Sequence, residues 1–295
     1  MAENANIKWS GKTGGQKWMQ TSLIFMFKCI NIRILYGIMS IIIIFYMIFS
    51  RESYKAIYYL FRERFGYSPF KSFCNVYLNH YKFGQIILDR FAFYAGKRFD
   101  ITIDGNEHFL NLRDGDDGFI ILSSHVGNYE LAGYHLTSEK KSFHALAFGG
   151  ETETVMKNRS KMFCRNNIKM IVVKGDMSHL FEINNALSEG NIVSMPADRI
   201  LGSTKFIDIK FLGKNAKFPM GPFATAVQRE IPAISIFVMK ESVKKYSIYV
   251  KKIDVPSVGN RSEKVQSMAS SFTSEMEKIL KQYPTQWFNY YNFWE

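Results

Sequence analysis

From about residue 99 onward the chain alternates short apolar runs with helix-like stretches, and this alternation constrains the fold more than any other feature. Such alternation predicts an α/β fold in which helices flank a largely parallel mixed sheet. The expected strands are Phe99–Asp104, Gly118–Ser124, Ser142–Phe148, Met170–Val173, Asn191–Met195, Ile207–Phe211, Ala233–Met239 and Tyr246–Val250. The expected helices are Tyr129–Ser138, Thr152–Cys164, Ser178–Glu189, Gly221–Arg229 and Ser262–Gln282.

The N-terminal part of the chain has a different character. Ile34–Ser50 is a run of 17 residues without a charge, with Lys28 and Arg33 before it and Arg51 after it. About 17 residues is the lower limit for a helix that crosses a bilayer, and basic residues at both ends indicate no orientation. The run predicts a membrane anchor that spans the bilayer or lies in its interface. A buried core helix is the alternative.

Residues 51–98 also have helical character, and the segment Gly66-Tyr67-Ser68-Pro69 breaks them into two parts. Aromatic residues lie among basic ones here, as expected for a helical platform that faces a membrane. A solvated helical pair is the alternative. We therefore expect an N-terminal helical membrane-anchoring region over residues 1–98 and an α/β domain over residues 99–295.

The charge distribution favours a membrane partner. The chain has a formal net charge of +12, and its first 100 residues hold 14 Lys and Arg against five Asp and Glu. A basic excess beside apolar helices is typical of attachment to anionic lipid headgroups. Nucleic-acid binding is the competing interpretation of this charge, but the sequence has no zinc-finger spacing or RNA-recognition signature, so no nucleic-acid partner is expected. The three scattered cysteines predict neither a disulfide framework nor a metal site.

One motif with catalytic chemistry follows the second expected strand. The segment His125-Val126-Gly127-Asn128-Tyr129-Glu130 lies where an apolar strand gives way to a helix. Gly127 and Asn128 supply the turn, since Gly frees the backbone and Asn is a preferred N-cap. Glu130 would accept a hydrogen bond from one ring N–H of His125, leaving the other nitrogen to act as a general base. The alternative is a histidine that only caps a turn.

Two further places have the chemistry of a binding site. Asp198 and Arg199 follow a buried strand, where α/β sheets place their ligands, although a surface ion pair is the alternative. Gly221 opens a helix whose backbone N–H groups are available to an anion or an oxyanion, unless it is an ordinary helix start. The candidate substrate-binding residues are Asn128, Asp198, Arg199 and Gly221.

The order and spacing of these segments resemble the lysophospholipid acyltransferase-like superfamily, and in particular its branch of late lipid A (lauroyl/myristoyl) acyltransferases. The resemblance runs from about Trp9 to the C-terminus and is strongest between Gly118 and Met239. Its motifs are Ser123-Ser124-His125-Val126-Gly127-Asn128-Tyr129-Glu130, Ala186-Leu187-Ser188-Glu189-Gly190, Asp198-Arg199 with Gly202, Phe211-Leu212-Gly213-Lys214-Asn215-Ala216, Phe218-Pro219-Met220-Gly221-Pro222-Phe223-Ala224 and Ile231-Pro232-Ala233-Ile234.

The resemblance implies acyl transfer from a thioester, carried by acyl carrier protein or by coenzyme A, to a lipid hydroxyl. It implies no metal and no tightly held cofactor, and it places the catalytic domain on the cytoplasmic face of the inner (plasma) membrane. By this resemblance His125 is the base, Glu130 is its orienting carboxylate and Asp198 is a further acid that shapes the site.

The sequence departs from the lipid A branch in two places. Members often carry an Arg where this chain has Met177, and they commonly end in a basic cluster where this chain has Phe288-Asn289-Tyr290-Tyr291-Asn292-Phe293-Trp294. Fewer cations near the site favour an acceptor that is less anionic than a phosphorylated glycolipid. The alternatives are therefore transfer to another lipid or to a polyketide-type acceptor, or a catalytically silent lipid-binding protein of the same fold.

Overall fold

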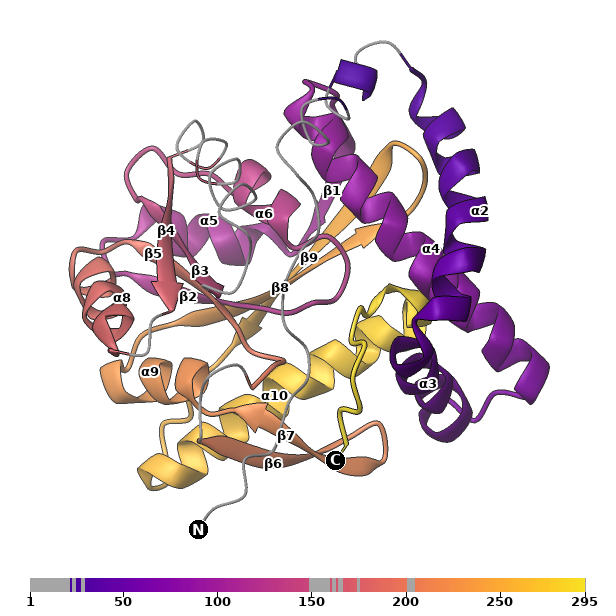
Figure 1. Ribbon diagram of the computed structural model, residues 1–295. Coiled ribbons are helices and arrows are strands. Elements are labelled where there is room, and N and C mark those ends of the chain that lie inside the picture. Colours follow the sequence, from indigo (N-terminus) through magenta and orange to yellow (C-terminus); the bar gives the residue numbers. More distant parts are fainter. Residues whose placement is uncertain are drawn as a thin grey trace.

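A seven-stranded sheet forms the centre of the protein (Figure 1). A computed structural model describes residues 30–148, 167–173, 176–200 and 205–294, together with residues 22, 25–27, 160 and 163. Every neighbouring pair of strands is parallel except β8 and β9, so the predicted largely parallel mixed sheet is confirmed. Across the sheet the strands are β1 (Asp100–Asp104), β9 (Lys245–Ile253), β8 (Ala233–Lys240), β2 (Phe119–Ser123), β5 (Ile192–Pro196), β3 (Phe143–Phe148) and β4 (Ile168–Val173).

The central strand β2 separates two apolar clusters. Its side chains alternate between the faces of the sheet, as strand geometry requires: Ile120 and Leu122 pack into one cluster, and Phe119 and Ile121 into the other. Helices α8 (Ser178–Ser188), α9 (Gly221–Arg229) and α10 (Arg261–Gln282) contribute to the first cluster. Helices α5 (Asn106–Asp114) and α6 (Glu130–His135) contribute to the second, together with helices from the N-terminal region.

Helix boundaries agree with the sequence prediction where the local signals are strong. Helix α9 has the predicted bounds, and α8 and α10 differ from theirs by one residue. A capping box formed by Asn260 and Glu263 begins α10 by satisfying backbone N–H groups at its first turn. Helix α6 is shorter than expected, and the predicted helix Thr152–Cys164 lies largely outside the described residues.

Sequence reasoning did not predict helix α5 or strand β7 (Lys214–Pro219). Strand β7 pairs antiparallel with β6 (Phe206–Phe211) in a separate two-stranded sheet. Leu212 and Gly213 connect the strands with positive φ angles of 47° and 84°, as a tight two-residue hairpin requires. Polar residues dominate the start of β7, so its sequence has little apolar signal. Helix α5 buries only Phe109, which explains why it too escaped prediction.

The N-terminal helices pack onto the sheet as part of its core. They comprise α2 (Ile32–Phe49), α3 (Arg51–Tyr59), the π-helical turn η1 (Leu60–Arg64) and α4 (Pro69–Tyr94). Helix α2 lies along α4 (Figure 1), and the two approach closely because Gly84 leaves room for the side chain of Met39. The hydroxyl of Tyr77 on α4 also donates to the backbone oxygen of Ser40 on α2, at 3.0 Å.

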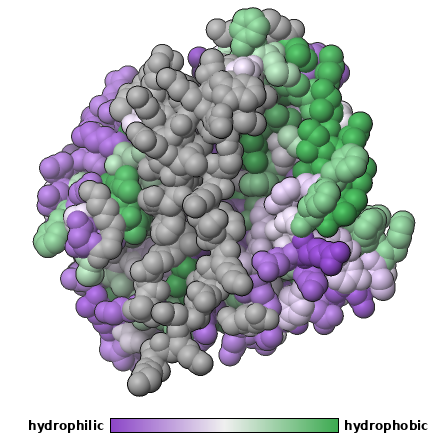
Figure 2. All heavy atoms as spheres, viewed as in Figure 1, coloured by the Kyte–Doolittle hydropathy of each residue, from purple (hydrophilic) through white to green (hydrophobic). Residues whose placement is uncertain are grey.

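The outer face of α2 is an exposed apolar surface, seen as the green band over this helix in Figure 2. By length and composition α2 is able to cross a membrane. Only Leu35, Tyr36 and Ile43 of this helix are buried, so it is not a fully enclosed core helix. The exposed apolar side chains of α2 and of the first half of α4 are Ile34, Ile38, Ile41, Ile42, Ile44, Phe45, Tyr46, Ile48, Phe49, Phe70, Phe73 and Leu78.

Candidate active site

His125 lies in the turn that joins β2 to α6, and the backbone of this turn is held from two sides. Gly127 N–H donates to the carbonyl of Gln286 at 2.7 Å, and Asn128 N–H donates to the carbonyl of Val238 at 2.8 Å. The carbonyl of His125 itself accepts from the N–H of Phe288 at 3.1 Å. The turn is thus hydrogen-bonded to β8 on one side and to the C-terminal segment on the other, and these bonds restrict the position of the imidazole.

Gly127 is required by this arrangement for two reasons. Its φ of +67° lies in the left-handed region, which favours glycine. A Cβ atom at this position would lie 2.0 Å from the carbonyl oxygen of Val238, far inside contact distance. The glycine of the motif is therefore explained by the close approach of the turn to β8.

A buried carboxylate contacts the ring of His125. Asp198 follows β5, which lies beside β2 in parallel, so the residues after both strands meet at the same edge of the sheet. Asp198 Oδ1 lies 2.9 Å from His125 Nδ1, and its Oδ2 accepts from the backbone N–H of His125 at 2.9 Å. The indole N–H of Trp287 points at the same Oδ2 at 3.4 Å. Asp198 is fully buried, whereas the side chain of His125 is 20% exposed.

The electrostatics of the pair define the state of the imidazole. Burial alone raises the pKa of Asp198. The charge of His125, its hydrogen bonds to Asp198 and the nearby Arg199 act in the opposite direction and bring this pKa below its ordinary value. Asp198 is therefore ionised at neutral pH and can only accept hydrogen bonds. It follows that Nδ1 of His125 carries the proton of the hydrogen bond. In the neutral ring, Nε2 is then the basic nitrogen.

Glu130 has several partners among the described residues, and its predicted contact with the ring of His125 stays a prediction. At the start of α6 it is buried, and its carboxylate forms an ion pair with Arg90 of α4 at 2.8 Å. It also accepts from the hydroxyls of Tyr94 at 2.6 Å and Tyr134 at 3.1 Å. The group that orients the ring at Nδ1 is thus Asp198, because adjacent parallel strands bring it to the imidazole, while Glu130 ties α6 to α4.

The other candidate residues take different positions. Asn128 is buried, and its amide donates to the hydroxyl of Tyr246 at 3.5 Å. Arg199 donates to the carbonyl of Phe288, so Asp198 and Arg199 do not form the exposed surface pair considered as an alternative. Gly221 begins α9. Its backbone carbonyl accepts a hydrogen bond from the hydroxyl of Thr225 at 2.9 Å. The role of Gly221 in holding an anion remains a prediction.

Sequence reasoning missed the part of the site contributed by the C-terminal segment. Gln286 and Phe288 hold the turn, and Trp287 contacts Asp198. The available signal was the segment Pro284-Thr285-Gln286-Trp287, in which a polar residue and a tryptophan precede an aromatic run. Within the described ranges, no three His, Cys, Asp or Glu side chains gather in a group that could hold a metal ion.

Comparison with known proteins identifies the class to which this fold and site belong. The model of the bacterial lipid A biosynthesis acyltransferase family matches residues 90–295, and the chain belongs to this family. It is accordingly an acyltransferase that acts on lipid substrates. None of the curated proteins matches the chain.

Among solved structures, the protein is similar to the crystal structure of the 1-acyl-sn-glycerophosphate (LPA) acyltransferase PlsC from Thermotoga maritima. The two chains share 14% sequence identity with a TM-score of 0.41, and the match covers 85% of this chain and 98% of that one.

We expect Gly127→Ala to lower both activity and stability. The added methyl group would meet the carbonyl of Val238, so the turn must shift away from β8 and His125 must move with it. A strained backbone conformation and a steric overlap in one position predict a loss of about 1–3 kcal/mol in the free energy of unfolding. Denaturant unfolding and an acyl-transfer assay measure the two effects. Gly213→Ala serves as a control: it also has a positive φ, but no atom lies within 4 Å of the added carbon. Equal loss of activity in both variants would contradict the proposed close approach.

Asp198→Asn is expected to reduce kcat by about 10²–10⁴-fold, because an amide no longer stabilises the imidazolium or selects the Nδ1–H tautomer. The substitution is nearly isosteric, so circular dichroism should show a folded protein. Asp104→Asn is the matched control, since Asp104 pairs with Lys251 at an exposed position. A pH profile adds a second readout: loss of the carboxylate should lower the pKa that limits kcat/KM on the acid side. Wild-type kcat in Asp198→Asn would refute the orienting role.

Proposed function

We propose that the protein transfers a fatty acyl chain from an acyl thioester, with acyl carrier protein as the donor, to a hydroxyl of a lipid A-type precursor. The observation that carries this proposal is the contact between His125 and the buried Asp198, at the end of two parallel strands, in a chain of the lipid A acyltransferase family. A carboxylate at Nδ1 and a partly exposed ring are the requirements of a general base. A protein that only binds lipid has no need of a pair so arranged.

In the proposed reaction, Nε2 of His125 takes the proton of the acceptor hydroxyl while the hydroxyl oxygen attacks the thioester carbonyl. The tetrahedral intermediate then collapses, the carbon–sulfur bond breaks, and the departing thiolate recovers the proton from the imidazolium. Asp198 stabilises the imidazolium between these steps. Such proton transfer contributes about 10²–10⁴-fold to a rate. The guanidinium of Arg199 and the backbone of Gly221 are the candidates for contact with the oxyanion.

Glu130 takes a supporting role in this proposal. Its contacts with Arg90, Tyr94 and Tyr134 fix the first turn of α6, which directly follows the catalytic turn. Replacing the carboxylate would leave three polar partners around a buried position without their common acceptor. The residue would thus affect catalysis by placing the helix that follows His125.

The donor and the acceptor are assigned by class. The basic excess of the first 100 residues suits both an acidic carrier protein and an anionic membrane surface. Where members of the lipid A branch often have Arg, this chain has Met177, an uncharged and exposed residue just before α8. A precursor with few phosphate groups near the reacting hydroxyl is the acceptor that fits this feature.

Helix α2 would hold the protein in the interface of the inner membrane, with the catalytic domain on the cytoplasmic side. One face of α2 packs on α4 and contributes Leu35 and Tyr36 to the core of the α/β fold. A helix enclosed by lipid on all sides could not keep these contacts, so an in-plane position agrees with them better than a spanning one. The outer face offers Ile and Phe side chains to acyl chains, as interfacial helices do.

His125→Ala should slow acyl transfer strongly without preventing folding. The assay uses purified protein in detergent, a radiolabelled acyl-acyl carrier protein, and a panel of acceptors that includes a lipid A precursor and a glycerolipid. We expect a rate reduced by about 10²–10⁴-fold for the variant. His108→Ala is the control, because His108 is a half-buried histidine on α5 beside Glu107. Turnover by His125→Ala at the wild-type rate would refute the mechanism. Acylation of the glycerolipid but not of the lipid A precursor by the wild type would refute the proposed acceptor.

Phe45→Asn is expected to weaken membrane binding about tenfold or more, since a full aromatic side chain contributes roughly 1.5–3 kcal/mol when it enters an apolar phase. Flotation with vesicles of phosphatidylethanolamine and phosphatidylglycerol measures the bound fraction. Phe181→Asn is the matched control, because Phe181 is also an exposed phenylalanine on a helix, on α8 at the opposite side of the molecule (Figure 1). Equal binding by the two variants would exclude α2 as the contact surface. Resistance of the wild type to alkaline carbonate extraction would show that α2 spans the bilayer.

A further inference from the structure

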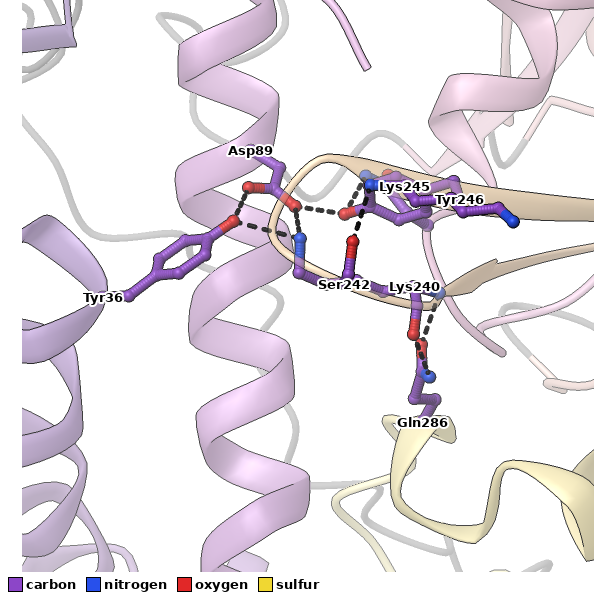
Figure 3. A network of polar contacts seen from close by, with 8 residues as sticks. Tyr36, Asp89, Lys240, Ser242, Lys245, Tyr246 and Gln286 are labelled. Atoms are coloured by element: carbon purple, nitrogen blue, oxygen red, sulfur yellow. Dashed lines mark hydrogen bonds and ion pairs between the residues drawn. The ribbon is translucent and has the colours of Figure 1, made fainter. Parts of the chain in front are cut away.

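A buried ion pair lies where α4 meets the end of β8 (Figure 3). The carboxylate of Asp89 and the ammonium group of Lys240 are 2.5 Å apart, and both side chains are almost completely removed from solvent. Two tyrosines complete the cluster, since the hydroxyls of Tyr36 and Tyr246 donate to different oxygens of Asp89. Lys240 donates in addition to the hydroxyl of Tyr36 at 3.0 Å.

The composition of this cluster does not suit a simple stabilising role. Removing two charges from water costs free energy that their mutual attraction often fails to exceed, and well-packed apolar residues can replace such pairs. The cluster fixes the relative positions of four elements. Its members are Tyr36 from α2, Asp89 from α4, Lys240 from β8 and Tyr246 from β9. A shift of α4 or β8 would separate the two buried charges, and a shift of α2 or β9 would remove a hydroxyl donor from Asp89.

Hydrogen bonds lead from the cluster to the catalytic turn through Gln286. The side-chain amide of Gln286 binds the backbone of Lys240 twice: its oxygen accepts from Lys240 N–H and its nitrogen donates to Lys240 C=O, both at 2.9 Å. The carbonyl of the same Gln286 accepts from Gly127 N–H at 2.7 Å. A single residue, Gln286, therefore connects the end of β8 to Gly127, which lies two positions after His125.

A second route passes through Tyr246. Its hydroxyl donates to Asp89 and lies 3.5 Å from the side-chain nitrogen of Asn128, which donates to it. The backbone N–H of Asn128 is in turn bound to the carbonyl of Val238 on β8. The two routes thus end on adjacent residues of the catalytic turn, Gly127 and Asn128.

We propose that Tyr36, Asp89, Lys240 and Tyr246 form a positioning network for acyl transfer, through which the seating of α2 on the domain sets the placement of the turn that carries His125. This inference rests on the proposed function and adds a role for residues that do not touch the reacting atoms. It also connects the two surfaces of α2: the outer face is apolar and exposed, and the inner face holds the hydroxyl that binds Asp89.

The test compares two tyrosines that join the same pair of helices. Tyr36→Phe removes a hydroxyl from the network, whereas Tyr77→Phe removes the hydroxyl that binds Ser40 and leaves the network intact. We expect Tyr36→Phe and Tyr246→Phe to lower kcat roughly 3- to 30-fold with an unchanged KM, and Tyr77→Phe to keep the wild-type kcat. Conservative changes are chosen because Asp89→Asn is at risk of failing to fold.

Hydrogen exchange provides a readout that does not depend on activity. In the peptide that covers residues 124–131, exchange of the Gly127 and Asn128 amides should be faster in Tyr36→Phe and Tyr246→Phe than in Tyr77→Phe, at matched denaturation midpoints. The double variant Tyr36→Phe/Tyr246→Phe should show less than the sum of the single effects on ln kcat.

The outcomes separate this inference from the proposed function. Equal kcat and equal exchange in Tyr36→Phe and Tyr77→Phe would overturn the network, even if the wild type transfers acyl groups. Faster exchange of the turn in Tyr36→Phe would support the coupling even if the assayed donor and acceptor gave no product. Additive effects in the double variant would show two independent contacts and would also overturn it.

Discussion

The parallel pairing of β2 and β5 is the constraint on which the rest of the structure depends. Its register sets Ser123 beside Pro196, so the segments that follow β2 and β5 leave the sheet at the same level. His125 and Asp198, 73 residues apart in sequence, are then brought to a contact of 2.9 Å. The neighbouring strand supplies the imidazole with a carboxylate partner from a fully buried position. Strand order thus determines which carboxylate meets Nδ1 of His125.

Three buried carboxylates belong to the polar contacts that lead to the turn with His125, and each joins different elements. Asp198 connects the end of β5 to His125, Glu130 connects α6 to α4, and Asp89 connects α2 and α4 to β8 and β9. Each accepts from several donors, as a buried charge must in order to offset its desolvation. The three carboxylates therefore connect helices on the N-terminal side of the chain with strands β5, β8 and β9 and with the turn that carries His125.

Much of the architecture was predictable from local sequence, and much of the site was not. Apolar runs such as Phe119–Ser123 and Ala233–Lys240 indicated strands because both faces of each are buried. The bounds of α9 followed from its Gly-Pro start. Periodicity contains no information on which strands become neighbours, so the contact between His125 and Asp198 was not predicted, although both residues were candidates. Strand β7 and the role of Gln286 were missed for the same reason, since both depend on contacts with distant segments.

The position of the N-terminal helices gives the fold a further property. In a protein with a separate anchor, membrane attachment and catalysis share only a linker, and each can change without the other. Here α2 contributes Tyr36 to the same core as Phe119 and Val238, and α4 supplies both Asp89 and Arg90 to the groups around the turn. An acyltransferase of lipid substrates must bring a soluble reaction centre to an acceptor held in a bilayer. With α2 as the membrane-binding helix that we propose, its packing into the core would hold the proposed reaction centre at a defined distance from the lipid surface, without a flexible connection.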